Sequence, residues 1–436
     1  MNPLAEELNN AIRGSSPDVY NMLSSLGREL FFPKGILTQS AEAKEKARKF
    51  NATIGIALEK GGPMHLPGIQ KYFNGLKPSD IYTYAPPAGR PDLRKAWLKK
   101  LLDDNPRMRD KHISNPVVVS AITHGLSVAG DLFADAGDVV LIHDKYWGNY
   151  RLTFSVMRKA RIETYPTYTA EGFFNVAALE EAIRKHGSAK GKVIVLLNFP
   201  INPTGYSPTL KEAEAAAKAL ASCAESGINL VVIHDDAYFG LFFEDGVMKE
   251  SLFGLTANLH KKILALKLCG ATKEEYVWGF RTGFLTFGAK AKDPAALYAA
   301  LEKKAMGAIR GNISNSPHPS QTIVLKALES PEFAKERREK YEIMKARANR
   351  VKAVLGDKKY DSAWTYYPFN SGYFMCLKLK SVGAEKLRVH LLDKYGVGTI
   401  AAGEKDLRVA FSCIETEDVQ ELFDIIHRGV CDLSAG

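Results

Sequence analysis

The chain has few cysteines, and their spacing is not that of a structural site. Five occur in 436 residues, and no two of them form a CxxC pair. Zinc sites need closely spaced ligands, and secreted disulfide frameworks need an even set of cysteines. We therefore predict neither a metal site nor disulfides, and the composition favours a reducing compartment.

A long apolar run is also missing. No stretch of the sequence approaches the ~18 to 20 consecutive apolar residues that span a bilayer. The opening residues, MNPLAEELNNAIRGSSPDVY, contain no basic segment followed by an apolar one, as a secretory signal would. We expect no membrane partner and a cytoplasmic location.

Positive charge is in excess but is not concentrated. The 59 Lys and Arg residues against 49 Asp and Glu residues give a net charge of +10 and a pI near 9.1. The basic residues are spread beside acidic ones, whereas a nucleic-acid surface gathers them on one element with aromatics between them. We expect a small anionic molecule, and no nucleic acid, as the partner.

Short apolar runs rich in Val, Ile and Leu alternate with stretches of helical spacing. The runs lie at residues 139–142, 193–197, 230–234 and 284–287, and helical stretches between them end in glycine. Strands that alternate with helices form a mostly parallel sheet with helices on both faces. The sequence thus predicts an α/β fold with three layers, α/β/α.

The pattern changes after Pro331. A long charged amphipathic helix follows, and then two strand-like segments, YFMCLKL and LRVAFS, and a closing helix. This predicts a smaller α+β domain at residues 331–436, which the long helix joins to a large domain at residues 80–330. Residues 1–79 match no strand-helix repeat, and we assign them to the small domain as an N-terminal segment.

Polar, turn-rich clusters follow the predicted strands. Ligands of open α/β sheets bind at the carboxyl ends of the strands, so the clusters HDKYWGN, NFPINPTG and HDDAY are the candidate site. Asp235 ends an apolar strand, where a carboxylate is costly unless it meets a cation or a donor. Its alternative role is a helix cap, and the alternative for Asn202 is a simple turn.

Lys273 precedes Arg281 by eight residues in the segment GATKEEYVWGFRTGF. A lysine that reaches a strand-end cleft can form a Schiff base, and the rigid fork of an arginine suits a phosphate. The alternative for a lysine beside two glutamates is a solvated surface turn. We expect Glu274 and Glu275 to be bystanders on the turn between Lys273 and Arg281.

With these residues in this order, the sequence resembles the fold type I pyridoxal-phosphate enzymes, and within them the class I/II aminotransferases related to aspartate aminotransferase. The resemblance covers roughly residues 80–415. It implies the PLP transferase fold, bound pyridoxal 5'-phosphate, a homodimer, and transfer of an amino group from an L-amino acid to a 2-oxo acid. Aspartate or glutamate with 2-oxoglutarate is the candidate pair.

The resemblance also implies roles for the candidate residues. Lys273 matches the Schiff-base lysine, because in this family that lysine precedes the phosphate-binding arginine, here Arg281, by eight positions. Asp235 matches the aspartate that pairs with the pyridine nitrogen, which lets the ring act as an electron sink. Tyr238 and Asn202 match the groups that hydrogen-bond the 3-oxygen of the cofactor.

Further matches concern the ring and the phosphate of the cofactor. Trp147 falls where the family stacks an aromatic ring on the pyridine. The phosphate is expected at a helix N-terminus near Thr123, with hydroxyls from Thr123 and Thr272. Tyr84, in YAPPAGRPDLR, matches a tyrosine that reaches the phosphate of the neighbouring subunit. At Gly270 the chain departs from the family, which often has a serine there.

Two arginines bear on the substrate. Arg408, in LRVAFS, matches the arginine that binds the α-carboxylate as a bidentate pair. Arg310, in IRGNISNSP, matches a segment in which aspartate aminotransferases place an arginine for the distal carboxylate across the dimer; the alternative is that it faces elsewhere. Aromatic or small apolar donors remain open.

Other functions are also open at this stage. A lyase on the same scaffold, such as a carbon–sulfur β-lyase or a decarboxylase, would share the cofactor site. A ligand-sensing regulator would carry a DNA-binding domain ahead of this fold, and the first 80 residues show no helix-turn-helix pattern.

Overall fold

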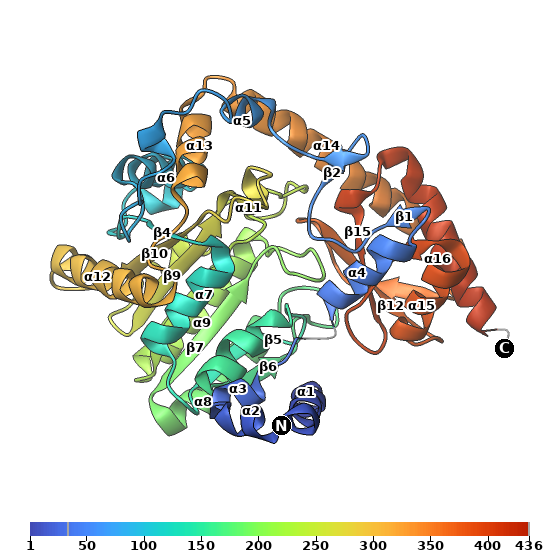
Figure 1. The fold of residues 1–436 in the computed structure, drawn as a ribbon, viewed down its shortest axis with the longest axis horizontal. Coiled ribbons are helices and arrows are strands. Elements are labelled where there is room, and N and C mark those ends of the chain that lie inside the picture. Colours follow the sequence, from blue (N-terminus) through green and yellow to red (C-terminus); the bar gives the residue numbers. More distant parts are fainter. Residues whose placement is uncertain (33–34, 435–436) are drawn as a thin grey trace.

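The apolar runs of the sequence form strands of one seven-stranded sheet (Figure 1). The structure, a computed structural model, describes residues 1–32 and 35–434. The strand order is β4-β10-β9-β8-β7-β5-β6, and all neighbours are parallel except that β10 runs antiparallel to β4 and β9. The strands are β4 (Val117–Val119), β5 (Val139–His143), β6 (Arg161–Tyr165), β7 (Lys192–Asn198), β8 (Asn229–Asp235), β9 (Ile263–Gly270) and β10 (Gly283–Ala289).

Helices cover both faces of this sheet, because both faces are apolar. Successive side chains of a strand point to opposite faces, and on β7 Val193 and Val195 belong to one apolar cluster while Ile194 and Leu196 belong to another. The covering helices are α6 (Pro91–Asp104), α7 (Ala121–Phe133), α8 (Val176–Lys190), α9 (Leu210–Glu225), α12 (Pro294–Asn312) and α13 (His318–Glu329). The predicted three-layer α/β/α fold is confirmed.

A second, antiparallel sheet lies toward the C-terminus (Figure 1). Its order is β11-β12-β15-β14, formed by β11 (Trp364–Tyr366), β12 (Phe374–Leu379), β15 (Asp406–Ala410) and β14 (Ile400–Ala401). The helices are α14 (Phe333–Leu355), α15 (Ala384–Tyr395) and α16 (Val419–Ser434). This is the smaller α+β part that the sequence predicts, and α14 is its long charged helix.

The N-terminal segment contacts both parts of the chain. Strand β1 (Phe50–Asn51) pairs with β13 (Val397–Gly398), and α4 (Ile36–Lys46) packs on the same region, whereas Glu29 forms an ion pair with Lys159 just before β6. We keep the boundaries 1–79, 80–330 and 331–436 as a proposal. The remaining helices here are α1 (Pro3–Ser15), α2 (Pro17–Met22), α3 (Ser25–Glu29) and α5 (Pro67–Lys71).

The short elements complete the described chain. They are β2 (Leu58–Glu59), β3 (Gly62–Pro63), α10 (Phe253–Thr256), α11 (Ala271–Glu274), a π-helical turn at Arg151–Val156, and 3₁₀ turns at Pro78–Asp80, Pro106–Met108, Lys358–Tyr360, Phe411–Cys413 and Thr416–Asp418. Within residues 1–32 and 35–434, no helix has the length and apolarity that crossing a membrane requires.

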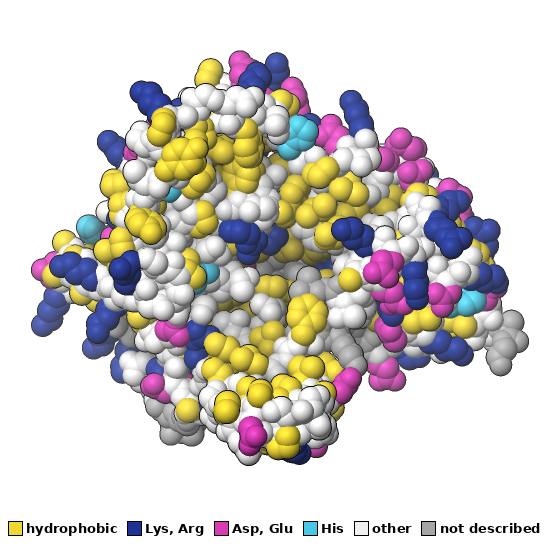
Figure 2. Space-filling view, viewed as in Figure 1, with side chains coloured by type: hydrophobic (Ala, Val, Ile, Leu, Met, Phe, Trp, Pro, Cys, Tyr) yellow, Lys and Arg dark blue, Asp and Glu magenta, His cyan; other side chains and the backbone are white. Residues whose placement is uncertain are grey.

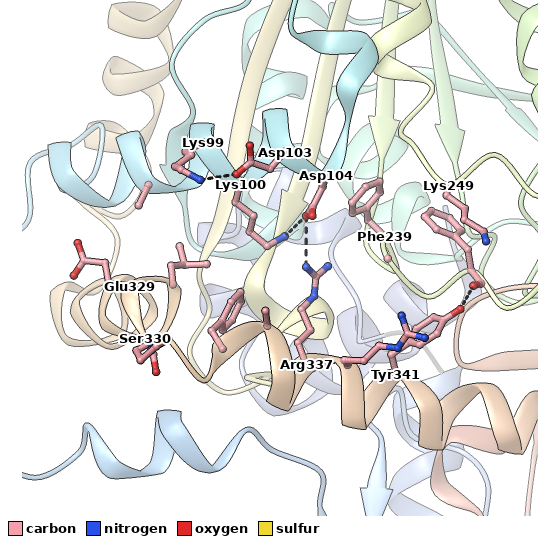
Figure 3. Close-up of a pocket in the computed structure, with 18 of the residues that line it drawn as sticks. Lys99, Lys100, Asp103, Asp104, Phe239, Lys249, Glu329, Ser330, Arg337 and Tyr341 are labelled. Atoms are coloured by element: carbon pink, nitrogen blue, oxygen red, sulfur yellow. Dashed lines mark hydrogen bonds and ion pairs between the residues drawn. The ribbon is translucent and has the colours of Figure 1, made fainter.

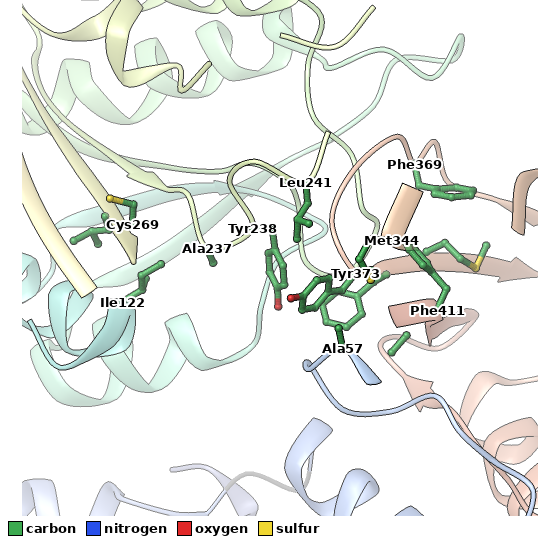
Figure 4. Close-up of a cluster of buried hydrophobic side chains, with 14 of the residues drawn as sticks. Ala57, Ile122, Ala237, Tyr238, Leu241, Cys269, Met344, Phe369, Tyr373 and Phe411 are labelled. Atoms are coloured by element: carbon green, nitrogen blue, oxygen red, sulfur yellow. The ribbon is translucent and has the colours of Figure 1, made fainter. Parts of the chain in front are cut away.

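One apolar core joins the two sheets. Tyr238, just after β8, and Tyr373, just before β12, pack edge to face with ring centroids 5.4 Å apart. Figure 4 shows them between Ile122 of α7 and Phe411 beside α14. The carboxyl ends of the central strands therefore face the second sheet.

Candidate active site

A cavity of about 200 Å³ lies at the carboxyl ends of β7, β8 and β9, between the two sheets. It is lined by nine of the eleven residues that the sequence singles out: Thr123, Trp147, Asn202, Asp235, Tyr238, Thr272, Lys273, Arg281 and Arg408. The strand-end rule explains part of this convergence, since Asn202, Asp235 and Lys273 lie at or just after the carboxyl ends of β7, β8 and β9. Arg408, by contrast, lies on β15 of the second sheet.

Lys273 lies on α11, a single turn that follows β9 directly. Its Nζ is 4.9 Å from the centroid of the Tyr238 ring. Burial is the main cause that lowers the pKa of this amine to about 8; the charge of Asp235 opposes the shift, and the charge of Arg281 adds to it. A sizeable fraction of the amine is therefore neutral near physiological pH, as a nucleophile or base requires.

Asp235 is 2 % exposed at the end of β8. Its Oδ2 accepts a hydrogen bond of 2.7 Å from the Tyr150 hydroxyl, and its Oδ1 accepts one of 3.1 Å from the Ala237 amide. Burial raises the pKa of Asp235 to about 6, whereas Tyr150 and the charge of Lys273 lower it. A carboxylate held in this way favours a cationic ligand group beside it.

Sequence reasoning missed Tyr150. It follows Trp147 by three positions in a cluster with several aromatic residues. Nothing in the spacing separates Tyr150 from Tyr146; the π-helical turn Arg151–Val156, which begins directly after Tyr150, places its ring in the core.

Among the described residues, Arg408 is a buried cation without an acidic partner. Its Nη1 donates to Asn202 Oδ1 at 3.0 Å, and its Nη2 donates to the Thr53 carbonyl at 2.7 Å. The guanidinium lies 4.1 Å from the centroid of the Phe374 ring. Burial lowers its pKa to about 10, and no carboxylate of the described residues pairs with it. An anionic ligand would supply the missing charge.

The turn after β7 must approach β12 closely to bring Asn202 onto Arg408. Gly205 has φ +77°, and a Cβ there would lie 2.0 Å from the Phe374 carbonyl oxygen. Only glycine fits this position, because every other residue adds a Cβ and disfavours positive φ. The NPTG segment is thus a tight turn that also builds the site.

One end of the cavity is a cradle of donors. The Thr272 hydroxyl is buried and has no hydrogen-bond partner in the described chain. Helix α7 begins at Ala121, so its free amides near Thr123 face the same space, and Arg281 adds a cation. Ala121 and Arg281 have φ of +62° and +55°. Strained backbone of this kind is typical of ligand sites, and the donor set fits a phosphate.

Tyr84 and Arg310 lie outside this cavity. Tyr84 is 88 % exposed, and Arg310, in the last turn of α12, is exposed and donates to the Ser314 hydroxyl. Their roles across a dimer stay predictions.

The two glutamates that follow Lys273 are buried and do not line this cavity. Glu274 and Glu275 are 5 % and 1 % exposed, and Lys100 Nζ lies 2.7 Å from Glu274 Oε2. Two carboxylates can be buried here because basic side chains from distant helices compensate their charges.

Residues 68–426 match the family model for aminotransferase class I and II. The chain belongs to this family. A probable aspartate/prephenate aminotransferase of Aquifex aeolicus is 27% identical over 84% of this chain and 88% of its own length. Cytoplasmic aspartate aminotransferase of Oryza sativa is 24% identical over 88% and 92%.

Solved aminotransferases share the fold. An aminotransferase from Anaerococcus prevotii superposes with a TM-score of 0.83 at 24% identity, over 95% of this chain and all of the other. Aspartate aminotransferase from yeast cytoplasm gives 0.77 at 20% identity, over 96% and 100%. These structures show the fold. The family match shows that the protein is an aminotransferase, and with the Aquifex and Oryza relatives it supports this prediction and not the lyase alternative.

Proposed function

We propose that this aminotransferase binds pyridoxal 5'-phosphate in the 200 Å³ cavity and uses aspartate or glutamate as donor. The observation that carries the proposal is the low-pKa amine of Lys273, held between the Asp235 carboxylate and the donor cradle at Thr272 and Arg281. Pyridoxal phosphate, when bound, supplies an electron sink for the α-carbon of the substrate.

The residues present fit the cofactor at each end. Arg281, Thr272, Thr123 and the start of α7 would hold the phosphate, and the buried Asp235 would pair with the ring nitrogen. Tyr238 and Asn202 would hydrogen-bond the 3-oxygen, and Trp147 would stack on the ring.

The chain also supplies the groups that handle the substrate. Arg408, which lacks an acidic partner among the described residues, would bind the α-carboxylate as a bidentate pair. Lys273, once its amine is released, would take the proton from the α-carbon and deliver it to the cofactor. The pKa of about 8 leaves enough neutral amine for this step.

The Tyr150→Phe variant tests the role of Asp235. Losing the 2.7 Å hydrogen bond removes a group that lowers the pKa of Asp235, so the carboxylate will ionise at higher pH. We expect the acid limb of cofactor affinity, measured by fluorescence titration, to move up by roughly 1 pH unit. Tyr146→Phe, in the same cluster, should leave it unchanged; equal profiles for both variants would refute the role.

We further propose a homodimer in the cytoplasm. Large exposed hydrophobic side chains include Ile54, Phe73, Tyr82, Tyr84 and Ile313, and Figure 2 shows hydrophobic side chains gathered around a hollow on one face. Such patches are typical of subunit interfaces. All five cysteines are free, which supports a reducing compartment.

Arg310 is proposed to bind the distal carboxylate of the donor in the partner's cavity. It is exposed and lies outside the cavity of its own chain. Relatives named aspartate aminotransferase support a dicarboxylic donor. We expect aspartate and glutamate to give the fastest conversion of the bound cofactor to its amine form in a screen of all amino acids. Responses only from aromatic or alanine-like donors would contradict the proposal.

A hybrid dimer tests Arg310 across the interface. The Arg310→Ala homodimer should lose about 10²-fold in kcat/KM for aspartate but little for alanine. A hybrid of one Arg310→Ala and one Lys273→Ala subunit, isolated with two affinity tags, should regain aspartate activity, because one cavity then has both residues. If Arg310 acted within its own chain, the hybrid would stay inactive.

A further inference from the structure

Five charged side chains lie together behind the turn that carries Lys273. They are Lys100 and Asp104 of α6, Glu274 and Glu275 of the turn, and Arg337 of α14, and we call them the charge cluster. Lys100 Nζ lies 2.7 Å from Glu274, 2.8 Å from Asp104 and 3.5 Å from Glu275; Arg337 Nη1 lies 3.6 Å from Asp104.

The cluster adjoins a cavity of about 1200 Å³ between α6 and the start of α14. Figure 3 shows Arg337 reaching from α14 toward Asp104 and Lys100, so that two helices meet through these charges. Helices α6 and α14 are long, whereas the turn that carries Lys273 is short. The cluster thus links a short segment to two rigid elements.

Glu275 depends on the two cations of the cluster. Neither of its carboxylate oxygens has a hydrogen-bond partner among the described residues. Burial raises its pKa, and Arg337 and then Lys100 oppose this most strongly. The cluster has three acids and two bases, so losing Arg337 would leave a buried carboxylate poorly compensated, which is strongly destabilising.

The turn itself has little internal support. Helix α11 is four residues long, and helices of that length are not stable alone. Its continuation is held by single backbone hydrogen bonds from Glu275 to Ala271 and from Val277 to Thr272, and Tyr276 has a φ of +56°. The position of Lys273 therefore depends on contacts made from outside the turn.

Helix α14 reaches both halves of the site. A Cβ at Gly240, two residues after Tyr238, would lie 3.0 Å from Arg337 Nη2. Ten residues after Arg337, about 15 Å along the helix, the fully buried Arg347 donates to the Ser412 carbonyl, four residues after Arg408. One helix thus contacts the segment that carries Tyr238 and the segment that carries the proposed carboxylate-binding arginine.

We propose that Arg337 and Glu275 are positioning residues, which fix the turn of Lys273 to α6 and α14 and so hold its amine in place for catalysis. The effect on catalysis rests on the role proposed for Lys273. The effect on the turn does not, because the cluster is formed by the chain alone.

Arg337→Met tests the proposal by two measurements. In the cofactor-free protein, amide hydrogen exchange of residues 271–277 should become at least about 10-fold faster, because the turn opens more often. In the loaded enzyme, kcat should fall at least about 10-fold while KM for the amino acid changes by less than about 2-fold, since a small misplacement of a reacting group is costly.

Matched variants separate positioning from general damage. Arg338→Met, at a neighbouring side chain that is 74% exposed, should match the wild type in both measurements. The double variant Arg337→Met/Glu275→Leu should recover part of both losses, because it removes the buried carboxylate together with the cation whose charge most strongly favours its ionised form. Arg337→Lys keeps the charge and should lie between wild type and Arg337→Met.

The outcomes are distinct. If residues 271–277 of Arg337→Met exchanged at the wild-type rate, the proposal would be overturned. If Arg337→Met does not fold, the same measurement on Arg337→Lys decides. Faster exchange with an unchanged kcat would also overturn it. Failure of the role proposed for Lys273 would show separately, as normal activity of Lys273→Ala.

Discussion

Replacing Lys273 with alanine is expected to lower turnover by ~10³-fold or more, because the variant loses both the amine that moves the α-proton and the covalent link to the cofactor. The fold should persist, because burial already disfavours the charged form of this amine and lowers its pKa to about 8, so its removal costs the folded state little. The rate of 2-oxo acid formation and the intact mass after borohydride reduction measure the two losses.

Lys261→Ala is the matched control. Lys261 is an exposed lysine in the chain leading to β9, and its loss should leave both the rate and the borohydride-fixed mass unchanged. Normal transamination by Lys273→Ala, with the cofactor still covalently attached, would show that another residue is the nucleophile.

Local patterns in the sequence were sufficient to predict four strands of the large sheet and the strand-end residues of the cavity, whereas Thr123, Trp147 and Arg408 were assigned to the site by resemblance to the family. The apolar run at residues 193–197 predicts the core of β7, and the rule for strand ends places Asn202 and Asp235 at one edge. Both inferences depend on neighbours in the chain, so no tertiary information was needed.

The parts that the sequence did not predict depend on distant partners. Glu274 and Glu275 look like surface residues, and their burial follows from Lys100, which is 174 positions from Glu274, and from Arg337 on another helix. The position of the Tyr150 side chain is determined by an irregular helical turn. Tyr84 and Arg310 concern a second copy of the chain, so their roles stay predictions.

Arg408→Met is expected to impair function and stabilise the protein at once. The substrate carboxylate would lose a bidentate charged partner, which is worth about 2–5 kcal/mol, so kcat/KM should fall by roughly 30- to 5,000-fold. In the absence of substrate, the wild type keeps a guanidinium that is 1 % exposed and unpaired with any described carboxylate. The desolvation of such a charge costs several kcal/mol.

The variant leaves the Thr53 carbonyl and the Asn202 Oδ1 atom without their donor, each at a cost of about 1–3 kcal/mol, and we expect the relief of the buried charge to exceed this cost. The midpoint of thermal unfolding without substrate should therefore rise. Arg408→Lys keeps a charge without the planar fork and should lose activity with no gain in stability. A dicarboxylic ligand should raise the unfolding midpoint of the wild type and not that of Arg408→Met. If Arg408→Met were instead less stable and still responded to the ligand, Arg408 would be a structural residue, and the α-carboxylate would bind elsewhere.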